Sequence, residues 1–311
     1  MNTRNETQSR NRSMLFHSTQ VLWATGLGLM LYAVGCEKRP AASAPATTNE
    51  APSAASAPQP TPPRVVPVVP LTNMVAVKAG TFQRAKFPVT LTKDYWIART
   101  EVTQGEFEAV MGRNPSHFKG DSNRPVEKVS FLDALAYCSV ITKREREAGH
   151  LPDQYLYRLP TEAEWEFACR AGTTNRYSFG DADDAITQYG WTTENAEGST
   201  HPVGQKQPNP LGLFDMHGNV WEWCLDWFAD YPQEPETDPV GPVGGMYKIF
   251  RGGSWNHDNP FARSGNRFMM SPSNGIHFVG FRLALGTRPP APTRPAQLNQ
   301  PKAPKRGNNA P

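Results

Sequence analysis

The stretch from Gly172 to residue 280 limits most strongly what this chain can fold into. Gly, Pro, Asn and Asp interrupt nearly every short apolar run in it, which excludes long helices and long strands there. Brief strands are predicted at Val75–Val77, Val220–Leu225, Lys248–Arg251 and Val279–Leu285. We therefore expect an α+β domain that is rich in loops and has few short strands. Long ordered loops in a compact domain are usually functional, so a site is expected in this half of the chain.

Three helices are predicted ahead of this stretch, because each has a capping box at its start. Thr103, Ser130 and Thr161 are each followed three residues later by an acid that can reach back to the N-cap N–H. The helices are expected to end at Met111, near Gly149 and at Gly172.

Two cysteines and three acids on these helices are given structural roles. Cys138 and Cys169 fall on apolar helix faces, which predicts that both pack in the core. Glu162, Glu164 and Glu166 look like a cluster for acid–base work. Acids near a helix N-terminus are favoured by the helix dipole, however, and we interpret these three in that way.

Proline marks two segments outside the predicted domain. Residues 37–70 hold 9 and residues 286–311 hold 7 of the 30 Pro, and both are almost empty of Leu, Ile and Phe. Such segments cannot bury enough apolar surface to offset the entropy lost on ordering. We predict a disordered tether over residues 36–70, one domain over residues 71–285 and a disordered basic tail after it.

The N-terminus resembles an export signal. Three Arg precede an apolar run, Val21–Val34, that is too short to span a bilayer comfortably and fits a signal peptide. The run ends in Ala33-Val34-Gly35-Cys36, which resembles a bacterial lipobox. We expect residues 1–35 to be a lipoprotein signal peptide and Cys36 to be lipidated, which would anchor the domain to a membrane of the cell envelope. The alternatives are an uncleaved anchor or a buried Cys.

The distribution of charge argues against a nucleic-acid partner. Residues 71–285 carry 21 Lys and Arg against 26 Asp and Glu, a net charge of −5, whereas the whole chain has a net charge of +3. The segments outside the domain therefore supply +8. No basic stripe with interleaved aromatic residues is visible, so we expect no nucleic-acid binding. The basic C-terminal tail is interpreted as solubilising, with contact to an anionic surface as the alternative.

Five motifs in order give the chain a specific resemblance. They are Glu101-Val102-Thr103, RLPTEAEWE at 158–166, GLFDMHGNVWEW at 212–223, RGGSW at 251–255 and GFR at 280–282. This series resembles the sulfatase-modifying-factor family, the formylglycine-generating enzymes and their relatives, and it covers essentially all of residues 74–285. The resemblance implies the family's variant of the C-type-lectin fold.

The chain departs from this family where the chemistry takes place. The resemblance implies an enzyme that oxidises a sulfatase Cys with O2 and a Cu(I) held by two thiolates, because soft Cu(I) prefers sulfur ligands. Those Cys stand three and eight residues after the Ser of RGGS, where this chain has His257 and Ala262. We therefore expect no copper and no formylglycine-generating activity, and the protein is expected to be non-catalytic.

The family's disulfides are missing as well. The resemblance places their helical Cys at Cys138 and Cys169, and their partners fall near Leu283 and Arg267. Three Cys follow Cys36, so at most one bridge can form among them. Whether Cys169 pairs with Cys224 or stays reduced is left open.

An oxidoreductase is the main alternative function. It would work by an altered formylglycine-generating site or by non-haem iron, which needs two His and one carboxylate. The His residues of the domain are scattered singly along the sequence. Other branches of the family include pyoverdine-maturation proteins and gliding-motility lipoproteins. The latter are exported, lipidated and non-catalytic, and this architecture matches them better.

The loop that contains RGGSW is the predicted binding surface. The resemblance places Trp221, Ser254 and Trp255 in the family's peptide-binding cleft, and three polar residues follow on the same loop, namely Asn256, His257 and Arg263. Aromatic area with adaptable polar groups is typical of recognition loops. We expect this surface to bind a peptide, a protein or an envelope component.

This loop has two other interpretations. RGGSW can be a structural corner in which Gly252 and Gly253 permit close backbone approach and Trp255 fills core. A Ser–His–Asp triad from Ser254, His257 and Asp258 is disfavoured, because residues this close in sequence rarely point at one another and no oxyanion element is identifiable.

The resemblance also implies a calcium site at Asp215, Gly218, Val220 and Glu222. Two carboxylates and two backbone carbonyls are hard oxygen ligands of the kind that Ca²⁺ prefers. We expect calcium as a cofactor. The alternative is that both carboxylates only accept hydrogen bonds from loop N–H groups.

Overall fold

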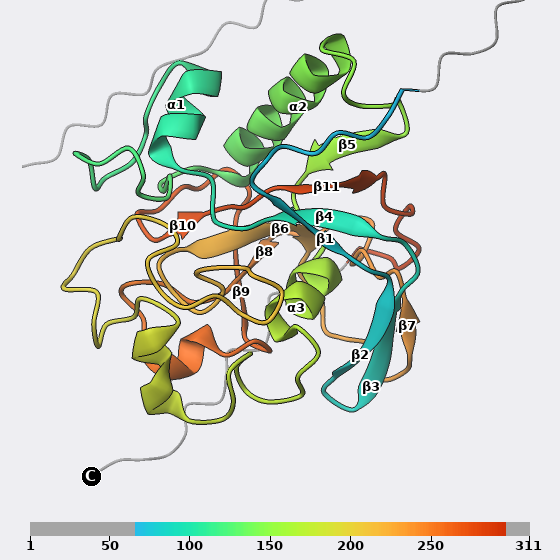
Figure 1. Ribbon diagram of the computed structural model, residues 1–311. Coiled ribbons are helices and arrows are strands. Elements are labelled where there is room, and N and C mark those ends of the chain that lie inside the picture. Colours follow the sequence, from blue (N-terminus) through green and yellow to red (C-terminus); the bar gives the residue numbers. More distant parts are fainter. Residues whose placement is uncertain (1–65, 297–311) are drawn as a thin grey trace, which may run out of the picture. The chain divides into compact units, whose positions relative to one another are not determined.

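The computed structural model describes residues 66–296 (Figure 1). The predicted signal peptide, Cys36 and nearly all of the tether lie outside the described residues. Within residues 66–296 no helix has the length and apolar character needed to cross a membrane.

Two four-stranded sheets form the centre of the domain. The first sheet is antiparallel and has the order β1 (Met74–Val77), β4 (Tyr95–Ala98), β11 (Ala284–Thr287) and β5 (Tyr155–Arg158). The second has the order β10 (Val279–Gly280), β6 (Trp221–Trp227), β8 (Lys248–Arg251) and β9 (Arg267–Met270), with β10 parallel to β6. A smaller sheet joins β2 (Gly80–Arg84), β3 (Phe87–Leu91) and β7 (Glu236–Thr237). The strands are short and the segments between them are long, as an α+β, loop-rich domain requires.

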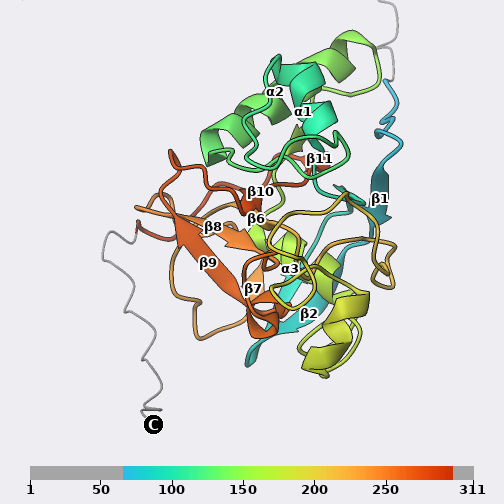
Figure 2. The same cartoon turned by 90° about the vertical axis from the view of Figure 1, so that its left-hand side faces the viewer.

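The three predicted helices are confirmed. They are α1 (Gln104–Met111), α2 (Phe131–Glu147) and α3 (Glu162–Arg170). Each begins with a complete capping box, in which the Ser or Thr accepts from the N3 N–H and the N3 acid accepts from the N-cap N–H. Figures 1 and 2 show α1 and α2 together at one end of the domain, with the short 3₁₀ helix Asp183–Gln188 at the other end.

The predicted strand Val279–Leu285 is wrong as a single element. Val279 and Gly280 pair with β6, whereas Ala284 and Leu285 pair with β4 and β5, so the chain changes sheets between them. Arg282 lies at this crossing and is fully buried. Its guanidinium needs partners from both sides, which a continuous strand would not supply.

The chain is ordered beyond residue 285. β11 runs to Thr287, and the Val243 N–H donates to the carbonyl of Arg294 over 2.9 Å. The end of β11 and this hydrogen bond therefore lie in the segment where a disordered tail was expected.

All three cysteines of the described residues are buried and unpaired. Cys138 and Cys169 pack in the core as predicted, and Cys224 does not pair with Cys169. Burial raises the pKa of Cys138 and of Cys169 to about 12, so both remain protonated at neutral pH.

Candidate functional site

The RGGSW segment turns sharply out of β8 at two glycines. Gly252 and Gly253 have φ of 106° and 81°, values that L residues with side chains rarely adopt. A Cβ on Gly253 would lie 2.7 Å from Cα of Ala262, and one on Gly252 would lie 3.2 Å from the ring of Trp165. The interpretation as a structural corner therefore holds for the two glycines, which bring the loop 254–262 back against its own start.

Ser254 and His257 contact each other directly. Oγ of Ser254 lies 2.7 Å from Nδ1 of His257 and 2.9 Å from Oδ1 of Asn256, and the Trp221 indole N–H donates to the same Nδ1 over 3.3 Å. Accepting at Nδ1 places the proton of the neutral imidazole on Nε2. Partial burial lowers the pKa of His257, opposed by Asp258, so the ring is neutral at physiological pH.

The expectation that these neighbours would not point at one another is wrong for Ser254 and His257. It holds for Asp258, whose Oδ1 accepts from Thr193 Oγ rather than from the imidazole. Ser254 is also fully buried, so no substrate reaches its hydroxyl. The three residues do not form a nucleophilic triad.

Aromatic side chains surround His257. Its ring centroid lies 5.1 Å from that of Phe278, 5.5 Å from Phe261 and 5.6 Å from Trp221. Phe261 and Phe268 are 41% and 46% exposed, which is unusual for Phe in a folded domain. We name the group Phe261, Phe268, Phe278 and Trp255 the aromatic rim.

Trp255 belongs to this rim and does not fill core. It is half-buried, its indole N–H donates to the carbonyl of His277 over 3.1 Å, and its ring meets Phe118 edge-on at 5.1 Å. The sequence analysis missed the phenylalanines of the rim and also His277. A signal was present, because three phenylalanines follow RGGSW within 25 positions.

Arg263 forms an intramolecular ion pair with Asp183. Its guanidinium forms three hydrogen bonds, of 2.8 to 3.3 Å, to the Asp183 carboxylate, which also accepts from the Tyr177 hydroxyl. This contact ties the loop to the helix Asp183–Gln188. The structure therefore places Arg263 at the base of the loop, away from Ser254 and His257.

The second of the two positions where the family has a thiolate is not accessible to solvent. Ala262 is buried, and its carbonyl lies 2.8 Å from Nδ1 of His217. Burial lowers the pKa of His217 to about 4, so this imidazole is neutral. In residues 66–296 no group of three or more His, Cys, Asp or Glu side chains is arranged to hold a metal ion.

The predicted calcium segment lies beside a buried acid, Glu101, that was not among the predicted calcium ligands. Arg282 donates two hydrogen bonds of 2.6 Å to the Glu222 carboxylate, one to each oxygen. Glu222 also accepts a hydrogen bond from the Trp165 indole N–H. By contrast, Oδ1 of Asp215 and both carboxylate oxygens of Glu101 are buried without partners. Burial first, then repulsion from Asp215 and Glu222, raises the pKa of Glu101 well above its ordinary value.

These unpartnered oxygens fit a hard divalent cation. With all three carboxylates ionised, they and the single guanidinium would carry a net charge of −2, which Ca²⁺ would balance. Asp215 and Glu101 supply the free oxygens, whereas Glu222 has most of its lone pairs engaged. The fit is therefore better for Asp215 with Glu101 than for Asp215 with Glu222.

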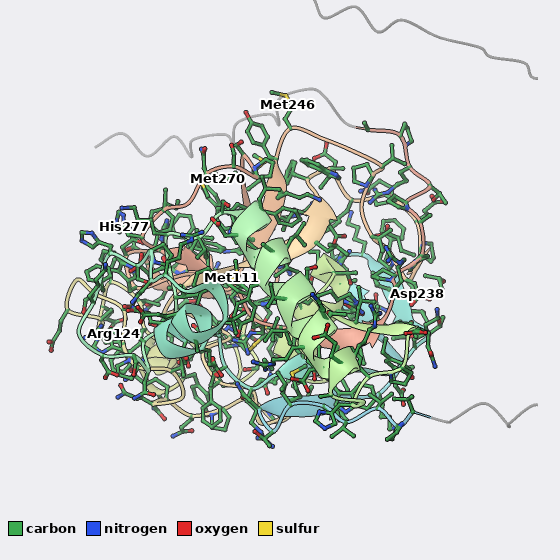
Figure 3. The ribbon with its side chains drawn as sticks, turned by 90° about the horizontal axis from the view of Figure 1, so that it is seen from above. Met111, Arg124, Asp238, Met246, Met270 and His277 are labelled. Carbon is green, nitrogen blue, oxygen red and sulfur yellow. The ribbon has the colours of Figure 1, made fainter. Side chains whose placement is uncertain are left out.

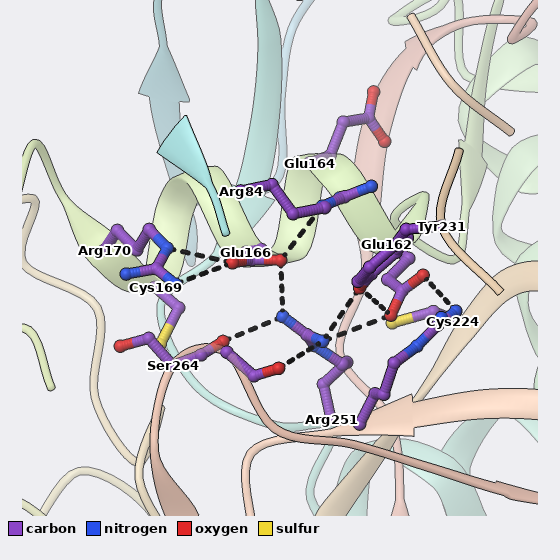
Figure 4. Close-up of polar contacts among 12 residues, drawn as sticks. Arg84, Glu162, Glu164, Glu166, Cys169, Arg170, Cys224, Tyr231, Arg251 and Ser264 are labelled. Carbon is purple, nitrogen blue, oxygen red and sulfur yellow. Dashed lines mark hydrogen bonds and ion pairs between the residues drawn. The ribbon is translucent and has the colours of Figure 1, made fainter. Parts of the chain in front are cut away.

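Glu162 and Glu164 lie in the first turn of α3, where the helix dipole favours acids, but the acids of α3 are also ion-paired, a role that this interpretation did not include. Arg251 donates to Glu162 over 3.1 Å and to Glu166 over 2.7 Å (Figure 4). The remaining members of this charge network are Arg84, Arg170, Arg267 and Tyr231. Glu164 alone has the predicted capping role, and it also pairs with Arg158.

Arg267 stands where the resemblance places a disulfide partner of Cys169. Its guanidinium reaches Glu162 at the start of α3 over 2.7 Å and stacks on the Tyr231 ring at 4.0 Å. The strand β9 is therefore joined to α3 by an ion pair. The other such position, Leu283, is a buried core residue.

Comparison with known proteins places this geometry in a family. Residues 60–286 match the model of the sulfatase-modifying factor enzyme 1-like domain. The chain is 34% identical over 230 residues to the chaperone protein LppX of Paenibacillus barcinonensis, covering 59% of this chain and 78% of that one. It is 38% identical over 193 residues to a formylglycine-generating enzyme of Streptomyces coelicolor, covering 54% and 55%. The chain thus spans about half the length of that enzyme.

Solved structures show the same similarity. Treponema denticola variable protein 1 aligns with a TM-score of 0.64 and 32% identity, over 70% of this chain and 95% of that one. PvdO from Pseudomonas aeruginosa aligns with a TM-score of 0.58 and 27% identity, over 68% and 93%. The expected resemblance is confirmed, and the chain belongs to the sulfatase-modifying factor enzyme 1-like family.

Proposed function

We propose that this protein is an exported lipoprotein, anchored through Cys36 in the cell envelope, that binds a peptide or protein partner on the aromatic rim without catalysis. The observation that carries the proposal is the state of the two positions where the family holds copper. His257 has its Nδ1 already engaged by Ser254 and Trp221, and Ala262 is buried with no ligand atom in its side chain. Neither supplies the soft sulfur that Cu(I) needs.

The rim supplies what a binding role needs. Exposed aromatic side chains offer large contact area at low cost in side-chain entropy. The rim residues come from the RGGSW loop, from β9 and from the segment before β10. Nε2–H of His257 has no hydrogen-bond partner among the described residues and is available to a carbonyl of a bound chain. The name of one relative, a chaperone protein, supports a partner that is itself a polypeptide.

Two finer features belong to the same proposal. We assign the domain to the variant of the C-type-lectin fold that the family resemblance implies. We also assign a structural calcium ion to the oxygens of Asp215 and Glu101, with carbonyls of Gly218 and Val220 as further candidates. The ion would neutralise buried charge and fix the loop that precedes β6.

Binding to a permanently unfolded polypeptide tests the function. The probe is reduced and carboxymethylated α-lactalbumin, titrated into the full chain by calorimetry. We expect binding that weakens at least tenfold in the double variant Phe261→Ser/Phe268→Ser. Leu132→Ser is the matched control, because Leu132 is a 56% exposed apolar residue on α2 that is not part of the rim. Equal loss in the control, or no binding by the wild type, contradicts the proposal.

The oxidoreductase alternative is tested separately. Protein purified without chelator is analysed for metals, and a Cys-containing sulfatase peptide is examined by mass spectrometry after incubation with it. We expect neither stoichiometric copper or iron nor formylglycine. The variant His257→Cys/Ala262→Cys restores two thiols and is expected to gain Cu(I) binding, which shows that the assay detects the site. Formylglycine formed by the wild type would overturn the non-catalytic assignment.

A further inference from the structure

A second groove lies at the other end of β6 from His257. Trp221 at the start of β6 contacts His257, and Trp227 at its end lines the groove. Six residue steps along a strand separate them by about 20 Å. The groove has a volume of about 860 Å³, within the usual range for small-molecule sites.

Three walls enclose this groove. They come from α2, from the segment Val240–Val243 and from the C-terminal strap Arg288–Pro292. Figure 3 looks down on α2 and shows Met111 of α1 on one side and the segment between Asp238 and Met246 on the other. Much of the lining is apolar, including Leu135, Leu225 and Trp227.

Lys248 brings a buried cation to the groove. It lines the groove although it is only 6% exposed, and its ammonium lies 4.0 Å from the Trp227 ring centroid and 4.5 Å from that of Phe131. One of its three N–H groups donates to the carbonyl of Leu225 over 2.7 Å. No ion pair joins it to a carboxylate within residues 66–296. Burial lowers its pKa to about 8, opposed by attraction from Asp226, so the ammonium is the main form at neutral pH.

The other charged side chains of the groove include more cations than anions. Lys143, Arg146, Arg158 and Arg288 line it together with Lys248, and Glu147 is the one acid among the described lining residues. Arg158 is neutralised by Glu164 and Lys143 faces Glu147, but no carboxylate pairs with Arg288 or Arg146 in the described part of the chain. Charge complementarity therefore calls for an anionic ligand.

The groove offers little to a peptide backbone. The adjacent edge of β5 is closed, because Thr142 bonds both the N–H and the carbonyl of Tyr157 and Arg146 bonds the carbonyl of Tyr155. The strap contributes three prolines, which have no N–H. Amides buried in this groove would remain unpaired, at a cost that an acyl chain does not have.

We propose that this groove binds a free carboxylate amphiphile, with its carboxylate on Lys248 and its acyl chain along Leu135, Leu225 and Trp227. The proposal is independent of the rim and of the polypeptide partner assigned to it.

Calorimetric titration of the full chain with octanoate, octanol and octylammonium tests the charge requirement. We expect octanoate to bind at least tenfold more tightly than either analogue. Lengthening the carboxylate should tighten binding by about fourfold for each added methylene that the groove still covers. Equal affinity for octanoate and octylammonium would sink the proposal.

Two variants assign the site. Lys248→Met should weaken octanoate binding at least tenfold and leave octanol unchanged, whereas Lys78→Met, at an exposed Lys just after β1, should change neither. Leu135→Trp narrows the groove without touching Lys248 and should weaken both ligands. Unchanged octanoate affinity in Lys248→Met overturns the assignment. Tighter binding of N-acetyl-Leu-Leu than of octanoate overturns the choice of an acyl chain over a peptide.

Discussion

The charge network and the aromatic rim share the motif RGGSW, which supplies Arg251 to the network and Trp255 to the rim. The two regions differ in burial and in charge. Arg251 is fully buried and pairs with two acids of α3, whereas Phe261, ten residues later, is 41% exposed. In the charge network the charged side chains are ion-paired, and they come from β2, α3, β8 and β9. The aromatic rim presents apolar surface with no partner in the described chain. The turn at Gly252 and Gly253 therefore separates a buried, ion-paired region from an exposed aromatic one.

The largest expected effect comes from breaking the network. Arg251→Met leaves Glu162 and Glu166 short of a buried cation, and we expect a loss of about 3–5 kcal/mol in the free energy of unfolding. Urea denaturation measures it. Arg263→Met, at the base of the rim loop, is the control and should unfold close to wild type. Similar losses in the two variants would remove the distinction between the regions.

Calcium should stabilise the loop that precedes β6. At a concentration 100 times its Kd, a ligand that binds only the folded state adds about 2.7 kcal/mol. We expect EGTA to lower the melting temperature of the wild type. Glu101→Gln should lose most of this response, and Glu108→Gln, an exposed acid on α1, should keep it. A full calcium response in Glu101→Gln argues against the assigned ligand.

The pH dependence of the unfolding free energy tests the buried charges at Asp226. This residue accepts a hydrogen bond from the Glu162 N–H beside the network. Burial, then Glu162, raises the pKa of Asp226 to about 7. The folded state then binds more protons than the unfolded state, so this group lowers stability as pH rises from about 4 to 7, by about 1 kcal/mol per pH unit. Asp226→Asn keeps the acceptor and should lack this component. The difference between wild-type and variant unfolding free energies, measured by urea titration at each pH, should therefore change steadily over that window. A constant difference contradicts the shift.

The smallest expected effect on stability is at the rim. Phe261→Ser removes an exposed ring, and we expect a change within about 0.5 kcal/mol by urea denaturation. Binding of the unfolded polypeptide should weaken in the same variant. A large loss of stability would mean that the ring is a structural element rather than a binding surface.

Local sequence determined the three helices. A capping box acts over three residues, so Thr103, Ser130 and Thr161 could be recognised without knowledge of the fold. The motif order determined the family, and the replacement of two thiols by His257 and Ala262 was visible in the chain itself. The apolar positions of Cys138 and Cys169 predicted their burial for the same reason.

Only the tertiary structure decided which charges meet. The partners of Glu162 are 89 and 105 residues away, and the unpartnered oxygens of Glu101 lie near Asp215 only because the chain returns through both sheets. It also brought Phe268 and Phe278 to the loop that carries His257, and Lys248 to the wall made by α2 and the strap. Interactions of a residue with its near neighbours are encoded in a few positions, whereas a buried charge or an exposed ring acquires its role from segments that meet only after folding.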